Sequence, residues 1–383
     1  MHASRRFRQA IEQRRQQQLY RQPTLIEQYQ GRLVQVAGQQ YLNFSGNDYL
    51  GLAQSDQLKA ALSEGALRFG SGSSGSPVLT GFHYAHQALT DKLCDWLQVE
   101  DVLLLSSGFA ANQLLLHTLP DKQDHLLLDK LCHASLIDAA LTAPCSYSRF
   151  SHQDWSALDS KLRQHSNSWV VTEGVFSMDG DSPDWSRLTA LCASHQAELI
   201  LDDAHGLGQS GPEGRGSWAA QGGNVAGISA LMANFGKALA GQGAFVAGST
   251  LLIDYLRQFG RHYIYSTSLS PALCWALCTA IDLCRKEQWR RDKLQQHSEL
   301  FRRLATEAEL PLLPSATAIQ PVLVGDTEKA LMLSEQLKQR GIWLSAIRPP
   351  TVPRHGARLR VTLSALHQTE DIYHLIKTLR SLW

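Results

Sequence analysis

The sequence has no C-x-x-C pair among its seven cysteines, and no apolar run approaches the roughly 18 residues that cross a bilayer. An odd, scattered set of cysteines favours buried thiols over a disulfide framework, so we expect a cytoplasmic protein outside the membrane. An excess of charge of one sign is also missing, because 36 Lys and Arg balance 35 Asp and Glu to a net charge of +1. Without a basic or acidic run, we expect no nucleic-acid partner.

The N-terminal segment, residues 1–23, lacks the apolar core of a secretory signal, since Arg and Gln stand where that core would be. Its basic character leaves an organelle presequence as an alternative. We expect an amphipathic helical arm.

The order of apolar and amphipathic segments predicts an α/β fold. From about Tyr41 to Gly248, short apolar runs alternate with amphipathic stretches, which indicates a doubly wound, mostly parallel sheet. After Pro271 the pattern changes to a long helical region and then to a smaller α+β lobe. We therefore expect an arm helix and the start of a hairpin, a large α/β cofactor-binding domain, and a small C-terminal α+β domain, over residues 1–45, 46–270 and 271–383.

The individual elements are expected from apolar periodicity. A hairpin is predicted from RLVQV and QQYLNF, and a final helix from a Thr369 cap followed by apolar residues at helical spacing. Further strands are predicted at residues 101–106, 125–129, 169–173, 198–202, 228–235, 244–249, 318–324, 342–347 and 358–363. Helices are predicted at residues 84–97, over a long region from 271 to about 305, and at 328–340.

Polar residues that could carry chemistry follow several of these strands. Lys237 lies in a glycine-flanked loop, where partial desolvation would lower the pKa of its ammonium and prepare the amine to attack a carbonyl. Asp202, Asp203 and His205 end another apolar strand, at the edge where doubly wound sheets bind ligands. A metal pair and helix capping by Asp203 are the alternatives.

Two more strand ends add to this set. Gly108 opens a helix after a buried strand, and backbone N–H groups at such a position form a phosphate site. A plain turn is the alternative there, and the spacing is not that of a P-loop or of a dinucleotide fingerprint. His133 follows the next strand, where a helix cap is the alternative. A lysine, an aspartate, a histidine and a phosphate loop together match the needs of pyridoxal 5′-phosphate (PLP).

The sequence resembles the α-oxoamine synthase family of fold type I PLP enzymes. The similarity extends from about Arg14 to the C-terminus and includes YLNFSGNDYLGL, GSGSSGS, SSGFAAN, DKLCHASLIDA, TEGVFSMDGD, LDDAHGLGQSGPEGRG, FGKALAGQGA, YIYSTSLSP and AIRPPTVPRHGARLRVTLSA.

The resemblance implies roles for the residues at the cofactor ring. Lys237 would be the Schiff-base lysine and Asp202 the partner of the pyridine nitrogen. His133 would stack on the ring and touch the substrate, and His205 would lie near the phenolic oxygen. Ser177 matches a further cofactor contact.

At the cofactor phosphate, Gly108 and Phe109 match the backbone cradle. Asn234 stands where the family has a hydroxyl, which leaves that contact in question. Ser266 and Thr267 match groups that the partner subunit supplies, so the resemblance implies a homodimer with shared active sites.

For the substrates, Arg348 matches the group that binds the amino-acid carboxylate, and Thr351 and Arg21 match acyl-substrate contacts. Asn47 and Glu173 match active-site neighbours. Arg348 as a surface charge and Arg21 as a solvated charge of the basic arm are the alternatives.

The Gly/Ser segment at residues 70–77 suggests a flexible loop at the mouth of the active site. A serine nucleophile there would need a strand–elbow–helix context that the sequence lacks.

The implied activity is the decarboxylative Claisen condensation of L-alanine with a pimeloyl thioester, on CoA or a carrier protein, in biotin biosynthesis. Other members of the family, such as glycine C-acetyltransferase, are the main alternative. A noncatalytic PLP carrier and a hydride-transferring enzyme are alternatives from other classes.

Overall fold

The large lobe is built on a seven-stranded sheet. The computed structural model describes residues 2–383. The strands lie in the order β4-β10-β9-β8-β7-β5-β6. Their bounds are β4 (Asp101–Leu105), β5 (His125–Asp129), β6 (Ser146–Phe150), β7 (Ser168–Glu173), β8 (Glu198–Asp202), β9 (Ala230–Asn234) and β10 (Ala244–Gly248). Only β10 runs against the others, pairing antiparallel with both β9 and β4, so the mostly parallel α/β fold is confirmed.

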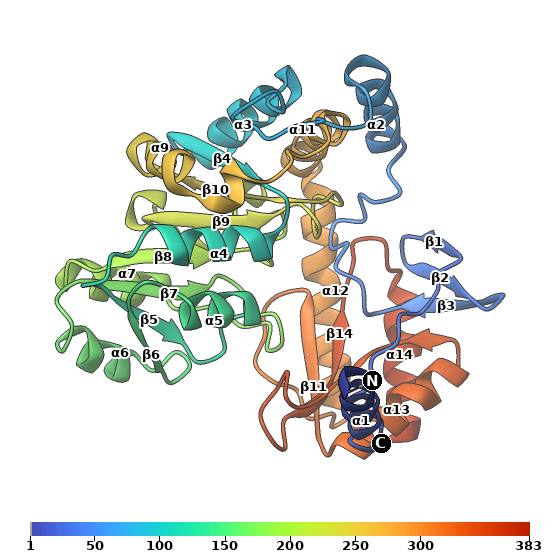
Figure 1. Ribbon diagram of the computed structural model, residues 1–383. Helices are drawn as coiled ribbons and strands as arrows, with labels where there is room; N and C mark the ends of the chain where they lie inside the picture. The colour runs from blue at the N-terminus through green and yellow to red at the C-terminus, as the bar shows by residue number, and fades with distance from the viewer. Residues whose placement is uncertain (1) are drawn as a thin grey trace.

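Both faces of this sheet are covered by helices (Figure 1). Successive strand residues alternate between two apolar clusters, as Leu126 and Leu127 of β5 do. One face packs against α3 (Tyr84–Leu97), α6 (Trp155–Leu162), α7 (Trp185–Ser194) and α11 (Pro271–Lys286). The other packs against α4 (Gly108–Thr118), α5 (Ala134–Leu141) and α9 (Thr250–Phe259). This two-sided burial explains why the strands read as continuous apolar runs.

The small lobe contains two smaller sheets. One has the order β11-β14-β13 and is antiparallel, and the other has the order β1-β2-β3-β12, with β12 parallel to β3. The strands are β1 (Gln28–Gln30), β2 (Leu33–Val36), β3 (Gln39–Asn43), β11 (Ile319–Gly325), β12 (Ile342–Trp343), β13 (Ala346–Ile347) and β14 (Ala357–Thr362). The helices of this part are α12 (Gln288–Glu307), α13 (Thr327–Gln339) and α14 (Thr369–Leu382).

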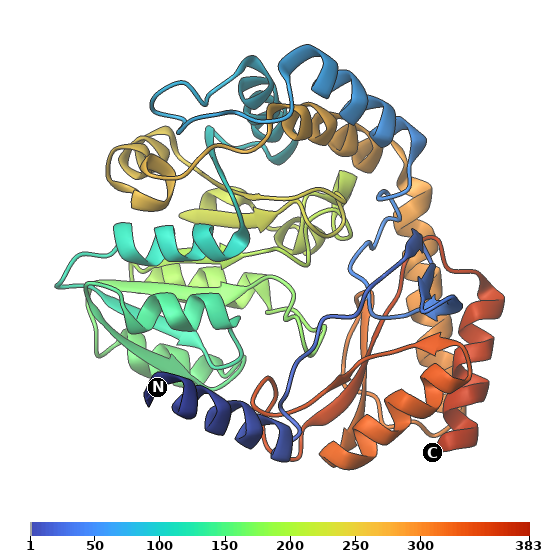
Figure 2. The ribbon, with the colours of Figure 1, turned by 45° about the vertical axis from the view of Figure 1, so that its right-hand side comes forward.

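The remaining helices are α1 (His2–Gln16), α2 (Asp56–Phe69), α8 (Ser217–Ala220) and α10 (Arg261–Ile264), with 3₁₀ turns at Pro212–Gly214 and Val225–Gly227. The predicted arm is helical, and in Figure 2 α1 extends from below the large lobe to the small lobe. Its residues from Ala3 to Gln16 are all exposed, including Phe7 and Ile11. No helix within residues 2–383 combines the length and apolar character that a bilayer crossing requires.

Several predicted element boundaries need correction. The strand expected at residues 342–347 is two short strands, because β12 pairs with β3 while β13 pairs with β14. The helical region after Pro271 is two helices that meet at Glu287. Helix α14 begins at Thr369, and its cap is Gln368, whose N–H donates to Asp371 Oδ2 at 2.8 Å.

Helix α11 begins at the predicted boundary between the large and the small domain, and it packs against α2 and α3. The division of the chain into domains stays a prediction. Strand β6 was not predicted, because its residues Ser146–Phe150 lie at the edge of the sheet and only Phe150 is buried.

Candidate active site

Two carboxylates and a lysine meet at adjacent strand ends. Glu173 at the end of β7 is the register partner of Asp202 at the end of β8, and their residues are 3% and 5% exposed. Lys237 follows the next strand, β9. Burial lowers the pKa of Lys237 to about 8, although Asp202 and Glu173 act in the opposite direction. The amine is therefore neutral for part of the time near neutral pH.

The buried carboxyl group of Glu173 is only partly hydrogen-bonded within the described chain. Its Oε1 is buried and makes no hydrogen bond within residues 2–383. Burial raises the pKa of Glu173 well above the usual range; the charge of Asp202 adds to this effect and that of Lys237 opposes it. The two carboxylates thus compete for one ammonium, which favours a proton on Glu173.

A chain of hydrogen bonds connects Asp202 to His133. Asp202 accepts from Asn112 Nδ2 at 2.8 Å and from the N–H of Ala204 at 3.1 Å. The same Asn112 amide donates to Ser135 Oγ at 2.8 Å, and Ser135 Oγ lies 2.8 Å from His133 Nδ1. His133 also caps α5, as its alternative role predicted. The orientations of the His133 ring and of the Asp202 carboxylate are therefore coupled through Asn112.

Asp203 has a structural role. Its carboxylate accepts from the N–H and the hydroxyl of Ser217, the first residue of α8, at 2.9 and 2.8 Å. A Cβ atom at either Gly174 or Gly206 would lie 2.0 Å from its Oδ1, so only glycine fits at these positions. Burial raises the pKa of Asp203 to about 7. Asp203 thus holds the start of a helix, in agreement with the capping alternative.

His205 forms a buried pair with Tyr49. The Tyr49 hydroxyl lies 2.6 Å from His205 Nδ1 and 3.4 Å from Asn47 Oδ1. Burial raises the pKa of Tyr49 to about 12, and burial together with the charge of Lys237 lowers the pKa of His205 well below its usual value. A neutral imidazole that accepts the tyrosine proton at Nδ1 carries its own proton on Nε2.

Arg360 is a site residue that the sequence analysis missed. It lies on β14, is 7% exposed, and donates from Nε to the carbonyl of Ser177 at 2.6 Å. Both of its terminal nitrogens lie 3.4 Å from Asn47 Oδ1. Its charge lowers the pKa values of Lys237 and His205, so it is near both. The available signal was a pair of arginines, Arg358 and Arg360, in an otherwise apolar strand.

The first turn of α4 has backbone N–H groups that could hold an anion. Ser107 caps this helix by accepting from the N–H of Ala110 at 3.1 Å, while the N–H groups of Gly108 and Phe109 make no hydrogen bond within the described chain. An ideal Cβ at Gly108 would lie 3.7 Å from Asn234 Nδ2, and Asn234 Oδ1 accepts from Gly236. Free N–H groups and an amide donor therefore gather at a helix N-terminus, which suits a phosphate.

No hydrogen bond within the described chain joins Ser266 or Thr267 to Lys237. Ser266 and Thr267 line a small cavity of about 30 Å³ together with Ser106, which precedes the first turn of α4. The Gly/Ser segment at residues 70–77 contacts this region, since Ser268 N–H donates to Gly75 and Ser76 Oγ donates to Ile264. The predicted flexible loop is therefore held by hydrogen bonds.

Three of the predicted substrate residues, Arg21, Arg348 and Thr351, lie at or near the arm. Both Nε and Nη2 of Arg348 donate to the carbonyl of Gln18, at 2.9 and 2.6 Å, and Thr351 N–H donates to the Arg348 carbonyl. Arg21 and Thr351 are exposed. No contact within residues 2–383 connects this group to Lys237, so its substrate role stays a prediction.

These residues fit PLP, the cofactor that the sequence resemblance implies. The α4 N-terminus suits its phosphate, the anchored carboxylate of Asp202 suits a protonated ring nitrogen, and the neutral amine of Lys237 suits its aldehyde. The unpartnered Oε1 of Glu173 shows that the buried cluster is not saturated by its own side chains.

Comparisons with known proteins agree with this arrangement. A family model described as aminotransferase class I and II matches residues 39–379. The 8-amino-7-oxononanoate synthase of Aeromonas salmonicida (strain A449) is 48% identical, over 97% of this chain and 93% of its own. A serine palmitoyltransferase from S. paucimobilis with bound PLP matches with a TM-score of 0.93 at 25% identity, covering 98% of this chain and 96% of that chain. The 8-amino-7-oxononanoate synthase from Francisella tularensis matches with a TM-score of 0.80 at 28% identity, covering 89% and 97%.

The pKa of Lys237 determines how fast the cofactor-free protein takes up PLP, because only the neutral amine attacks an aldehyde. The rate of uptake, followed by absorbance, should increase with pH, reach half of its maximum near pH 8 and level off at higher pH. Asp202→Asn removes the charge that most favours the ammonium of Lys237, so it should move the midpoint to lower pH. A midpoint near the 10.5 of an ordinary lysine would contradict the buried site.

Proposed function

The chain belongs to the aminotransferase class I and II family, and we propose that it condenses L-alanine with a pimeloyl thioester to give 8-amino-7-oxononanoate, CO₂ and the free thiol carrier. The carrying observation is the 48% identity, over nearly the whole chain, to an enzyme named for that product. The polar cluster around Lys237 supports the proposal, because it provides the groups that the reaction needs. The sequence alternatives from other classes have no comparable support.

PLP is the proposed cofactor, and when bound it supplies an electron sink for a carbanion at the alanine Cα. Gly108, Phe109 and Asn234 would hold its phosphate, and His133 would cover one face of its ring. The carboxylate of Asp202, fixed by Asn112, would keep the ring nitrogen protonated because a neighbouring negative charge favours the charged form.

Arg360 and Asn47 would bind the alanine carboxylate. Arg360 is a buried guanidinium whose Nε is fixed on the Ser177 carbonyl and whose Nη1 donates to Thr362 Oγ1 at 3.1 Å. Each terminal nitrogen carries two N–H groups, so N–H groups beyond these contacts can donate to an anion. A carboxylate held there fixes the direction of the alanine Cα–H bond. Lys237, with a pKa of about 8, is partly neutral near neutral pH and can accept that proton.

The remaining bond changes need water to be excluded. The alanine Cα forms a bond to the thioester carbonyl carbon, the thiol leaves, the alanine carboxylate departs as CO₂, and a proton returns to the carbon. Lys237, once protonated, can donate this proton to the carbon. His205, neutral and buried against Tyr49, supplies a hydrogen-bond donor without adding charge. Arg21 and Thr351 are the proposed contacts of the acyl chain.

Incubation of the holoenzyme with L-alanine and pimeloyl-CoA tests the proposal. We expect release of a free thiol and formation of 8-amino-7-oxononanoate, detected by mass spectrometry. Parallel reactions with glycine and acetyl-CoA serve as the control for the rest of the family, and a preference for that pair would refute the assigned substrates. Failure with both pairs would refute the proposed reaction.

Substitutions of Arg360 and Arg348 should have different effects on the KM for alanine. Arg360→Lys keeps a charge but loses the bidentate geometry, so the KM for alanine should rise roughly 10- to 100-fold, as expected for a lost charge-assisted contact. Arg348→Lys should alter the KM for alanine less than about threefold, because the guanidinium of Arg348 contacts the arm and not the residues around Lys237. Steady-state kinetics with alanine varied distinguishes them, and the reverse ranking would restore Arg348 as the carboxylate group.

We infer that two chains form a homodimer with shared active sites in the cytoplasm. Ser266 and Thr267 lie near the α4 N-terminus but on a surface with exposed apolar residues, among them Leu79 and Tyr265, which are 80% and 72% exposed. All seven cysteines are free thiols, which suits a reducing compartment.

Mixing two inactive variants tests the shared sites. A chain with Ser266→Ala and Thr267→Ala, mixed with a Lys237→Ala chain under conditions of subunit exchange, should give heterodimers with one intact site. Random pairing then restores about a quarter of wild-type turnover, because half of the dimers carry one working site of two. Mass spectrometry of the intact dimers controls for exchange, and exchange without restored turnover would show that each site belongs to one chain.

A further inference from the structure

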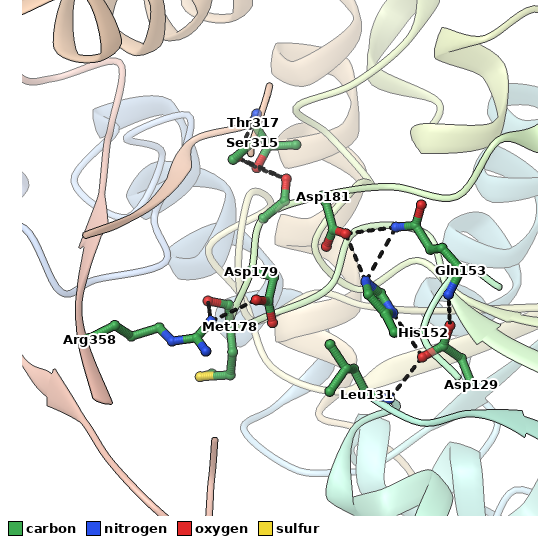
Figure 3. Close-up of polar contacts among 11 residues, drawn as sticks. Asp129, Leu131, His152, Gln153, Met178, Asp179, Asp181, Ser315, Thr317 and Arg358 are labelled. Atoms are coloured by element: carbon green, nitrogen blue, oxygen red, sulfur yellow. Dashed lines mark hydrogen bonds and ion pairs between the residues drawn. The ribbon is translucent and has the colours of Figure 1, made fainter. Parts of the chain in front are cut away.

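A second polar cluster lies beside the active site, centred on His152 (Figure 3). His152 Nδ1 is 2.9 Å from Asp129 Oδ1, and Nε2 is 2.8 Å from Asp181 Oδ2. Because a carboxylate oxygen faces each ring nitrogen, both nitrogens carry protons and the ring is a cation. Burial of the ring lowers the pKa of His152, but the hydrogen bonds of Asp129 and Asp181 outweigh it and raise the pKa to about 10.

Asp129 connects this cation to the loop that carries His133. It ends β5, its residue is 1% exposed, and its Oδ1 also accepts from the N–H of Leu131 at 2.8 Å. The Asp129 carbonyl accepts from Cys132, so the whole turn before His133 is fixed by this residue. The position of the His133 ring therefore depends on where the Asp129 carboxylate is held.

Asp181 connects the cation to the segment after β7. This segment closes on itself, since Phe176 N–H donates to the Asp181 carbonyl at 2.9 Å and Gly180 N–H donates to Phe176 at 2.8 Å. The Phe176 ring meets His152 edge-on, with centroids 4.4 Å apart. Asp181 Oδ1 is buried and makes no hydrogen bond within residues 2–383, so His152 and Gln153 are its fixed partners.

The opposite side of the same segment contacts the small lobe. Arg358 Nη1 donates to Asp179 Oδ1 at 2.7 Å and to the Met178 carbonyl at 3.1 Å (Figure 3). Arg360 Nε donates to the Ser177 carbonyl. The segment from Ser177 to Asp181 thus lies between the His152 cation and two arginines of β14.

Gln153 also holds the carboxylates of Asp129 and Asp181 in place. Its φ is 50°, in the left-handed region that side chains rarely adopt. In this conformation its N–H reaches Asp129 Oδ2 at 3.0 Å and its Nε2 reaches Asp181 Oδ2 at 2.7 Å. The same two carboxylates are therefore bridged twice, by adjacent residues.

We propose that His152 is a positioning residue for alanine: as the cation between Asp129 and Asp181, it fixes the Ser177–Asp181 segment and, through the Ser177 carbonyl, the guanidinium of Arg360. The inference rests on the proposed function, since it assumes that Arg360 binds the substrate carboxylate. His152 touches neither substrate nor cofactor. Without the cation, the two carboxylates repel each other and the segment that orients Arg360 loses its anchor.

The test is a spectroscopic titration of the PLP-loaded enzyme with alanine, which needs no acyl donor. His152→Ala should raise the dissociation constant of alanine roughly 10- to 100-fold, because small misplacements of an orienting group have effects of that size. The KM for pimeloyl-CoA should change less than about threefold, since Arg360 acts on the alanine side. Unchanged alanine affinity would overturn the proposal.

Two further variants separate positioning from general stability. His195→Ala is the control, because it removes a similar histidine–aspartate pair elsewhere in the chain. His195 Nε2 lies 2.8 Å from Asp159 Oδ1, and the side chain of His195 is 21% exposed, against 24% for that of His152. His195→Ala should leave alanine affinity unchanged, and an equal loss would overturn the proposal. Asp181→Asn preserves size and a polar partner, and it should weaken alanine binding in the same direction.

A double variant tests whether His152 acts through Asp181. If it does, His152→Ala adds little to the loss already caused by Asp181→Asn, whereas independent, multiplying losses contradict the coupling. Failure of the proposed function would look different: the wild-type enzyme would bind alanine yet form no product with pimeloyl-CoA. In that case the alanine titrations still decide the role of His152.

Discussion

The site depends on one electrostatic constraint, which is that two carboxylates end neighbouring buried strands. Glu173 and Asp202 are register partners on β7 and β8, where water cannot solvate them fully, so their charge must be shared with protons or cations. Lys237 supplies one positive charge, and Asn112 donates one hydrogen bond that fixes the Asp202 carboxylate. A bound ring nitrogen that carries a proton would complete the balance, which explains why the cluster is left unsaturated.

The two carboxylates of the LDDAH motif, Asp202 and Asp203, have different roles. Asp202 faces the cluster, while Asp203 turns the other way and is closed off by glycines and Ser217. Asp202 is the last residue of β8 and Asp203 follows the strand, and the two carboxylates bind different partners, so only Asp202 serves the site. The second is then free to hold the start of α8.

The candidate site residues that are easiest to recognise in the sequence are those that follow strongly apolar strands. The runs before Asp202, His133 and Lys237 are buried on both faces of the sheet, and this makes both the strands and the polar residues after them visible in the sequence. Arg360 could not be predicted from the sequence, because its role depends on a contact between the small lobe and the segment after β7, which lie far apart in the chain. His152 could not be predicted for the same reason, because its partners come from two other elements. The edge strand β6, only partly buried, gave no apolar pattern at all.

The sheet that joins β3 to β12 has a consequence for the order of events during synthesis. Leu42 pairs with Ile342, and Arg32 pairs with Asp371 of the last helix at 2.7 Å. At roughly 5–20 residues per second, about 15 to 60 s of translation separates the two strands, and through that time the edge of β3 has no partner. The N-terminal hairpin is therefore among the first segments made and among the last to be completed, so a nascent chain that stops short of Trp343 exposes a strand edge open to pairing with other chains.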